Sequence, residues 1–512
     1  MRRWTPLLCA LLLGTLCGCP SLAVRPAPTS GTPAAPSAAA PVAPGRFAQL
    51  APVVDVHCHV FNARDVAVEE FLTAHGAPRE LAAFVRLAVD ALDEERAPAR
   101  LAALSPGLRG LAEQVQGLFA GTAPGQASPA QLMLLETLWR VSEAGPLREE
   151  LDALASGPRP EGTLGGWAGT ARDALRWALL LSRKRSSLAD QLVATYPETA
   201  LFTPVVVDMH HWFGQREALP GSYEAQMAEM RALLRAWRGR MLPFASFCPE
   251  RERLRRLKPG APPLREVLAG MAAEGFVGIK LYPPFGFRPT ANDQLDPTHE
   301  CAVKVPHPVR VAYDALLEEL YAACEELDLA ISAHCEDPGA GLARCGEHAD
   351  PRWWALVLAR HPRLRLDLMH MGGVEGLVAD PQESWGRIAA GLMHRYPHVY
   401  ADTGAHAVPG DQALRQRFFA VLDQLERELP GLRGKIMFGT DWHLTVRHPE
   451  HELFEQRYLS AWEARWGLAA ARRFAGEAAL AFLGLRQGQT GARVRALFAR
   501  EGWPIPDWLQ PR

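Results

Sequence analysis

The sequence has few features of a nucleic-acid-binding or redox protein. Its 55 basic and 57 acidic residues leave a formal net charge of −2, and no long basic run is present. A protein that binds nucleic acid normally concentrates basic residues on one surface, so this balance argues against nucleic acid as a partner. None of the nine cysteines forms a CxxC pair, which argues against a thiolate zinc site and against a dithiol redox motif.

Long hydrophobic runs are also rare, and the clearest one stands at the N-terminus. Arg2 and Arg3 precede an apolar segment of about ten residues, Leu7–Leu16, which is too short to span a bilayer as a helix. This pattern is typical of a secretory signal peptide. The segment Leu16-Cys17-Gly18-Cys19 resembles a bacterial lipobox, which predicts a signal over residues 1–19 and lipidation of Cys19.

The next segment, residues 20–46, contains almost no large apolar side chain. It consists mainly of Pro, Ala, Ser, Thr and Gly, and such a composition cannot bury enough surface to offset the entropy of ordering. We expect a disordered tether that holds a folded domain off a membrane, so the only expected membrane contact is the lipid on Cys19. The expected location is the cell envelope. Cleavage after Ala23 is the alternative, and it would release a soluble periplasmic or secreted protein.

From Pro52 onward, short apolar runs alternate with helical patterns. Alternation of strands and helices predicts a parallel sheet, and eight strands predict its closure into a barrel. We therefore expect an α/β fold over residues 47–512, a (β/α)8 TIM barrel. The candidate strands are 53–60, 201–209, 242–247, 276–282, 329–335, 364–370, 399–403 and 435–441.

One long gap separates the first two candidate strands. Residues 63–200 are rich in Leu, Ala, Arg and Glu, and breaks in the pattern indicate four or five helices. This segment is predicted to be a helical insertion within the barrel. It leaves the face of the barrel that carries catalytic residues, so it forms either a cap over the site or a side domain without contact to substrate.

The sharpest motif is Asp55-Val56-His57-Cys58-His59 in the first candidate strand. Side chains alternate along a strand, so His57 and His59 share one face with Asp55. Two imidazoles at this spacing can hold one cation, since Zn–N bonds of about 2.0–2.1 Å are within their reach. An isolated HxH pair on a strand is nevertheless more often a chance occurrence than a ligand pair.

Four later residues strengthen the interpretation: Lys280, His334, His370 and Asp441. Each stands at or near the C-terminal end of a candidate strand, where barrel enzymes place their active sites. Alternation directs three of them into the barrel. His370 is the exception, because an inward His370 would place Asp367 on the side of the helices.

Together these residues resemble the amidohydrolase superfamily. The order HxH, Lys, His, His, Asp is that of the superfamily. The sequences around these residues are similar to those of its amidohydrolase-related branch, which includes decarboxylases of aromatic acids. The resemblance covers roughly residues 52–485 without the insertion. The segments that carry it are Gly278-Ile279-Lys280-Leu281-Tyr282-Pro283, Ser332-Ala333-His334-Cys335, Leu368-Met369-His370-Met371-Gly372-Gly373 and Phe438-Gly439-Thr440-Asp441-Trp442.

The resemblance implies a metal-dependent enzyme. It implies that one divalent metal is bound by His57, His59, His334 and Asp441. It also implies that Asp441 moves the proton of a metal-activated water, and that His370 polarises the substrate or binds a second metal. In some members the lysine that Lys280 resembles is carbamylated and bridges two metals. Zinc is the first choice for the His/Asp ligands, with manganese and iron as alternatives.

Other residues are expected around the mouth of the barrel. His210, Tyr282 and Arg288 follow candidate strands and are predicted to contact a small-molecule substrate. His443 departs from the family pattern, in which proline often follows the Asp-Trp pair. Cys301 and Cys345 stand in the loops after the fourth and fifth strands, which are neighbours at the mouth, and are predicted to form a disulfide.

The expected function is hydrolysis of a C–N or C–O bond in an amide, lactone or ester. A metal-dependent, non-oxidative decarboxylase of a small carboxylic acid is the alternative, because it would use the same ligands. A non-catalytic envelope lipoprotein that uses the barrel for binding is a third interpretation. The sequence contains no indication of the oligomeric state.

Replacing Cys19 by alanine tests the predicted lipid anchor. The variant lacks the sulfur that would carry the lipid, so we expect it to leave the detergent phase in a detergent-partitioning experiment, while the wild type stays there. A Cys19→Ala protein that partitions as the wild type does would contradict the anchor.

Overall fold

The computed structural model describes most of the chain beyond the predicted tether. The described ranges are 47–50, 52–74, 78–93, 102, 104–120, 128–144, 171–209, 223–299, 305–336, 343–446 and 450–511. The predicted signal and tether lie outside these ranges, as do His210 and Cys301. Residues from Pro41 onward form one compact unit, and the fold described below belongs to that unit.

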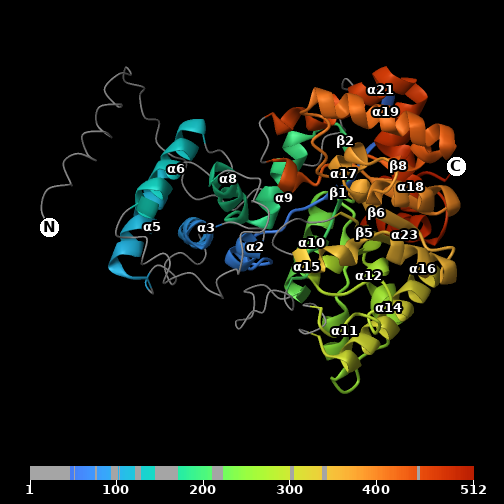
Figure 1. Cartoon of the computed structure of the whole chain (residues 1–512), viewed down its shortest axis with the longest axis horizontal. Helices are drawn as coiled ribbons and strands as arrows, with labels where there is room; N and C mark the ends of the chain where they lie inside the picture. Colours follow the sequence, from blue (N-terminus) through green and yellow to red (C-terminus); the bar gives the residue numbers. More distant parts are fainter. Residues whose placement is uncertain are drawn as a thin grey trace, which may run out of the picture. The chain divides into compact units, whose positions relative to one another are not determined.

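Seven of the eight predicted strand segments contain a strand, and the second overlaps β2, which begins two residues earlier than predicted. Several of these strands are labelled in Figure 1. All observed pairings between neighbouring strands are parallel. The α/β fold with a parallel sheet is therefore confirmed. The strands are β1 Val53–Cys58, β2 Thr199–Pro204, β3 Phe244–Ser246, β4 Gly278–Leu281, β5 Ala330–His334, β6 Leu366–Met369, β7 Val399–Asp402 and β8 Ile436–Met437.

Backbone hydrogen bonds connect the strands in sequence order. β1 pairs with β2, and β3 to β8 form one sheet of consecutive neighbours. Parallel bridges between Phe202 and Met241 and between Val205 and Phe244 join β2 to β3. The amide of Val56 in β1 donates to the carbonyl of Phe438, the residue after β8 (3.1 Å). The first strand thus meets the last, as a barrel requires.

Helices stand in the connections between successive strands (Figure 1). Six of the described helices stand between β1 and β2, where the insertion was expected: α2 Val68–Ala74, α3 Arg79–Leu92, α5 Pro106–Leu118, α6 Pro129–Ala144, α8 Ala171–Leu181 and α9 Arg185–Thr195. The helices that follow β2 to β5 are α10 Tyr223–Ala236, α11 Pro249–Arg256, α12 Leu264–Ala273, α14 His307–Leu327, α15 Ala343–Gly346 and α16 Arg352–Arg360. The later helices are α17 Val374–Ala379, α18 Trp385–Arg395, α19 Gln412–Glu428, α20 Trp442–Thr445, α21 Phe454–Arg472, α22 Ala478–Phe482 and α23 Gln489–Glu501.

Helix α19 shows how the local sequence produces this layer. The Asp411 side chain accepts a hydrogen bond from the amide of Leu414 and caps the first turn, which otherwise leaves amides without partners. Leu414, Phe418 and Leu422 recur at a spacing of four residues and are buried along one face.

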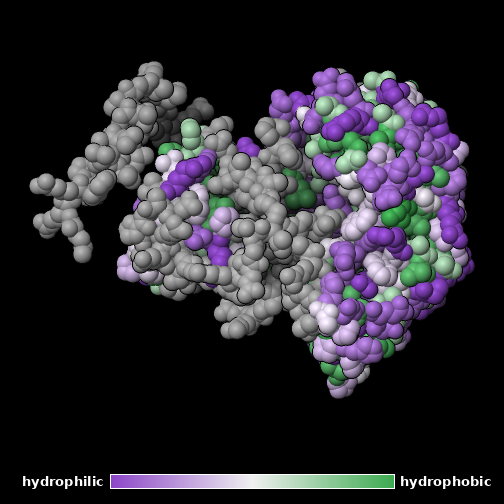
Figure 2. All heavy atoms as spheres, in the orientation of Figure 1, coloured by the Kyte–Doolittle hydropathy of each residue, from purple (hydrophilic) through white to green (hydrophobic). Residues whose placement is uncertain are grey.

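Hydrophilic residues dominate much of the visible described surface (Figure 2). Among the described residues, no helix combines the length and the apolar composition that a bilayer span requires.

In strand β6 the side chain of Asp367 faces inward, contrary to the alternation expected from an inward His370. Asp367 points into the barrel, because its Oδ2 accepts a hydrogen bond from the Ser332 hydroxyl of β5 (3.1 Å). His370 still reaches the site, since the strand ends at Met369 and His370 has a positive φ of 65°. The prediction that Asp367 faces the helices was wrong because the regular alternation of a strand does not continue through this turn.

The helical turn Arg473–Glu477 follows α21 and contacts β1 through Gly476. The replacement Gly476→Ala tests this contact. A Cβ atom at Gly476 would lie 1.9 Å from the carbonyl oxygen of Pro52, so β1 and this segment would have to separate. Such overpacking typically costs about 1–3 kcal/mol, which urea unfolding would measure. Gly270→Ala is the matched control, because no atom lies within 4 Å of its Cβ position in α12. Equal stability of the two variants would contradict the close contact.

Candidate metal centre

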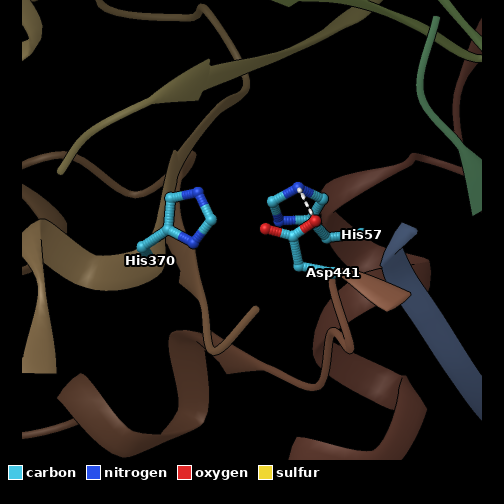
Figure 3. Close-up of side chains that lie close together, drawn as sticks. All are labelled: His57, His370 and Asp441. Atoms are coloured by element: carbon cyan, nitrogen blue, oxygen red, sulfur yellow. Dashed lines mark ion pairs between the residues drawn. The ribbon is translucent and has the colours of Figure 1, made fainter. Parts of the chain in front are cut away.

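Three side chains from distant parts of the chain converge at the ends of the strands. His57, His370 and Asp441 each place one potential ligand atom within 4.8 Å of the other two, and all three residues are buried. They come from β1, from the turn after β6 and from the loop between β8 and α20, and their side chains point toward one another (Figure 3). Closure of the strand ring produces this arrangement, because it places residues 57 and 441 side by side.

The imidazole of His57 lies between two carboxylates. Its Nδ1 lies 3.0 Å from Oδ2 of Asp402, the last residue of β7, and its Nε2 lies 3.9 Å from Oδ1 of Asp441. A Cβ atom at Gly404 would lie 2.6 Å from the same Nδ1, so the chain after β7 can approach the ring only as glycine. A carboxylate behind a histidine fixes the ring orientation and its tautomer, which is a common arrangement around metal-binding histidines.

Two other imidazoles are held in the same way by backbone carbonyls. Nδ1 of His59 lies 3.1 Å from the carbonyl oxygen of Val205, and Nδ1 of His370 lies 2.9 Å from that of Gly404. A carbonyl oxygen only accepts hydrogen bonds, so the proton of each neutral ring is placed on Nδ1. The Nε2 lone pairs are then available to a cation, and Nε2 of His59 lies 3.6 Å from Oδ1 of Asp441.

His334, at the end of β5, completes the predicted histidine set. Its ring centroid lies 4.9 Å from that of His370 and 4.4 Å from that of Tyr282, on which it stacks. Its Nε2 is buried and has no hydrogen-bond partner among the described residues. A buried nitrogen without a partner is costly in a folded protein, and binding a cation would remove that cost.

Buried carboxylates outnumber the buried lysine around this site. Burial lowers the pKa of Lys280 to about 8, although Asp402, Asp441 and Asp367 act in the opposite direction. The pKa of Asp367 is raised by burial and by neighbouring Asp402. Burial opposes ionisation of Asp402 as well, but His57 holds its pKa below the usual value. This acidic surplus, together with the histidine donors, fits a divalent cation.

The backbone is strained at two of the converging residues. His370 has a φ of 65° and Asp441 a φ of 47°, a region that residues with a Cβ atom rarely adopt. The amide of Asp441 donates to the carbonyl of His57 (2.7 Å), and the His370 carbonyl lies 2.9 Å from Nε2 of His406. Strained positions that the surroundings hold in place are frequent at functional sites.

Sequence reasoning did not include Asp402 and Glu336 in the site. Asp402 ends a predicted strand just as the other candidates do, so its position was a usable signal. Glu336 follows His334 by two residues, and its Oε2 lies 3.9 Å from Nδ1 of His370. Nothing in the local pattern distinguishes this glutamate, because its proximity to His370 depends on the packing of two loops.

The insertion contacts the metal-site loops through His443. The ring nitrogens of His443 lie 2.8 Å and 2.9 Å from the carbonyl oxygens of His59 and Phe61. Trp177 of helix α8 donates its indole N–H to the carbonyl of His443 (2.9 Å). His443, which departs from the family pattern, therefore connects the insertion to the segment after β1 that contains His59.

Among the remaining predicted residues, Arg288 is paired elsewhere, Lys280 lies beside the site, and His210 and Cys301 are outside the described residues. The guanidinium of Arg288 lies over the ring of Trp353 (4.3 Å), and its Nη2 lies 3.3 Å from Oε1 of Glu347. Lys280 Nζ contacts the sulfur of Met369 in the barrel interior. Cys345 is disulfide-bonded, but the predicted pairing with Cys301 stays a prediction, because Cys301 lies outside the described residues.

Comparison with known families identifies the class of protein. A family model described as Amidohydrolase matches residues 185–485, more than half of the chain. The chain therefore belongs to this amidohydrolase family, and the predicted resemblance is confirmed. The family comprises metal-dependent hydrolases and decarboxylases. The matched range includes Lys280, His334, His370 and Asp441, but it begins after the HxH motif.

Several solved structures resemble the chain at low identity. An amidohydrolase from Burkholderia multivorans with bound zinc is 15% identical, with a TM-score of 0.37, over 60% of this chain and 91% of that one. The 5-carboxyvanillate decarboxylase of Sphingomonas paucimobilis is 14% identical, with a TM-score of 0.37, over 61% and 89%. An uncharacterized TIM-barrel protein from Bordetella bronchiseptica is 15% identical, with a TM-score of 0.35, over 60% and 83%. A search of curated proteins found no match.

The replacement Asp402→Asn tests the contact behind His57. Asparagine can still accept the hydrogen bonds that the amides of Gly404 and His370 donate to Asp402, so the fold should persist. It carries no charge to hold the His57 ring, and we expect metal affinity to fall by about 10–100-fold in a competition titration with a chelator. Asp411→Asn keeps the cap of α19 and serves as the control. Unchanged affinity in Asp402→Asn would show that this carboxylate does not orient a ligand.

Proposed function

We propose that the protein is a metal-dependent hydrolase that cleaves a C–N or C–O bond of an amide, lactone or ester. The observation that carries this proposal is the convergence of buried His57, His370 and Asp441, with their ligand atoms within 4.8 Å of one another. Membership of the amidohydrolase family supports it. The fold that we propose for the catalytic unit is a (β/α)8 barrel, with residues 63–200 as a helical insertion.

The proposed ligands are His57, His59, His334 and Asp441. Three of these side chains are buried, and His59 is largely buried, as expected for ligands shielded from bulk water. His370 lies close enough to serve either as a further ligand or as the group that polarises the substrate carbonyl. Zinc is the proposed metal, because neutral imidazoles and one carboxylate are ligands that zinc prefers. Such a cation, when bound, supplies Lewis acidity toward water and toward a carbonyl oxygen.

Asp441 is proposed as the group that accepts the proton of the attacking water. Its backbone is held by hydrogen bonds on both sides: its amide donates to the carbonyl of His57, and its carbonyl accepts from the amide of Leu444 (2.8 Å). The carboxylate is therefore presented in one orientation between His57 and His59. A positioned carboxylate can take a proton from water and return it to the leaving group.

The cationic side chains favour hydrolysis over decarboxylation. A decarboxylase must bind the carboxylate of its substrate, which a lysine or arginine commonly does. Arg288 is already paired with Glu347, and Lys280 contacts Met369 among three aspartates. To bind a substrate carboxylate, Arg288 would have to leave Glu347 and Lys280 would have to turn away from the aspartates, so these two cations of the described part of the chain do not favour decarboxylation. Tyr282, which is stacked on His334, is the proposed aromatic wall for the substrate.

The cell envelope is the proposed location of the protein. The support comes from the sequence alone: a signal-like segment, the lipobox-like residues before Cys19 and a tether between them and the folded unit. We further propose that the insertion forms a cap that contributes to substrate selection. The hydrogen bond from Trp177 to the carbonyl of His443 supports a cap, because it connects α8 to a loop of the metal site.

A substrate panel with labelled water tests the reaction class. The zinc-loaded protein is incubated with amides, lactones, esters and aromatic carboxylic acids in water enriched in oxygen-18. Hydrolysis incorporates the label into the product acid, whereas decarboxylation releases carbon dioxide and forms no labelled product acid. His57→Ala and His334→Ala are expected to lose the metal of this site and turnover. Unchanged metal content in both variants would reject the proposed site, and carbon dioxide release would replace hydrolysis by the alternative.

The replacement Asp441→Asn separates catalysis from folding. Asparagine is nearly isosteric and can still offer a carbonyl oxygen to a metal, so the variant should fold and retain some metal. It cannot accept a proton near neutral pH, and we expect turnover to fall by about 10²–10⁴-fold. Rate and melting temperature are measured on the same sample. Near-normal turnover per folded molecule would overturn the assignment of Asp441 as the base.

A further inference from the structure

A second group of potential ligands lies in the loops that follow β4 and β5. His299, Glu347 and His348 place one ligand atom each within 4.8 Å of the other two. Nε2 of His299 lies 3.1 Å from Oε1 of Glu347, and the ring centroids of His299 and His348 are 5.8 Å apart. These residues belong neither to the barrel site nor to its proposed mechanism.

His348 is the residue whose burial requires an explanation. Its relative exposure is 0%, and neither of its ring nitrogens has a hydrogen-bond partner in the described part of the chain. A neutral imidazole carries a lone pair on one ring nitrogen, which can bind a cation. A purely structural role would leave a buried polar ring without compensation, which proteins normally avoid.

Glu347 and His299 give an ion access from solvent, and Glu347 also supplies negative charge. The side chain of Glu347 is 53% exposed and that of His299 is 22% exposed, so an ion can enter from solvent on their side. Glu347 supplies the negative charge that a site with two neutral imidazoles needs. Nη2 of Arg288 also contacts Oε1 of Glu347 (3.3 Å), which holds the carboxylate toward the loop after β4.

Hydrogen bonds within each loop hold the group in place. The carboxylate of Asp296 accepts from the amide and the hydroxyl of Thr298, and its carbonyl accepts from the amide of His299 (2.9 Å). Arg310 of α14 donates to the carbonyl of Leu295 (2.6 Å), which fixes this turn to the barrel wall. Buried Leu295 in turn packs against Cys345 in the loop after β5. The two loops are therefore in contact beside the ligand group.

We infer that His299, Glu347 and His348 form a second divalent-cation site, of zinc-binding character, that ties together the loops after β4 and β5. Two imidazole nitrogens and one carboxylate oxygen match the ligands of zinc, and a fourth position remains for water. The loops after barrel strands shape the substrate entrance, so an ion here rigidifies the entrance without taking part in the reaction. The inference does not depend on the proposed function of the barrel site.

Zinc stoichiometry in a set of four full-length proteins tests the second site. The proteins are the wild type, His57→Ala, His348→Phe and the double variant, each exposed to zinc, desalted and analysed for metal. We expect two zinc ions per chain in the wild type, one in each single variant and none in the double variant. Zinc should raise the melting temperature of His57→Ala but not that of the double variant, because only a bound ion stabilises the folded state.

Further variants make the outcome unambiguous. Glu347→Gln changes an exposed side chain, so it should fold normally and still lose zinc from the loop site. His361→Gln is the matched control, because His361 is a buried histidine whose ring lies 3.0 Å from Glu318, outside the proposed group. Equal zinc content in His57→Ala and the double variant would overturn the inference. Loss of zinc in His348→Phe with none lost in His57→Ala would instead reject the barrel metal and keep the loop site.

Discussion

The junction of β1 and β8 is the constraint on which the rest of the structure depends. The amides of Thr440 and Asp441 donate to the carbonyl of His57, and the carboxylate of Asp55 accepts from both the amide and the hydroxyl of Thr440 (3.0 Å and 2.7 Å). These bonds join residues that are almost four hundred positions apart in the chain. They are buried, so water cannot substitute for a lost partner, and breaking one would leave a polar group unsatisfied. The ring of strands is closed here, and the proposed site exists only when it is closed.

The helical insertion begins shortly after the residues of β1 that form this junction. The contacts of the insertion therefore bear on the site. Arg185 at the start of α9 reaches back to the carboxylate of Asp65 (2.6 Å) and to the carbonyl of Val60 (3.3 Å), so the return to β2 is tied to the exit from β1. Trp177 adds a hydrogen bond to the carbonyl of His443. The segment that follows the HxH motif is thereby held by the C-terminal part of the insertion, directly by Arg185 and through His443 by Trp177, so changes in the insertion can alter the position of His59.

The site contains two kinds of group. The donor atoms of its histidines are oriented by hydrogen bonds, and the negative charge of its carboxylates is only partly balanced. Burial makes each of these groups expensive to ionise, and one ammonium, that of Lys280, lies among three aspartates. The two neighbouring carboxyls Asp402 and Asp367 are shifted in opposite directions: His57 lowers the pKa of Asp402, whereas burial and Asp402 raise the pKa of Asp367. A divalent cation would add the missing positive charge, and the Nε2 atoms of His59 and His370 are oriented to receive it.

The sequence by itself determined the order of strands and helices, the parallel α/β class and the family, because these follow from local periodicity and from short motifs at strand ends. It also supplied the six proposed site residues. Tertiary structure decided the rest. Asp402 became a partner of His57 only because the tertiary structure brings the end of β7 close to the end of β1, and His370 reached the interior through a turn with positive φ that interrupts the alternation of β6. The role of His443 and the approach of His299 to His348 depend on contacts between loops. Local patterns determine how a segment folds, whereas closure of the ring and packing of the loops determine which distant side chains meet.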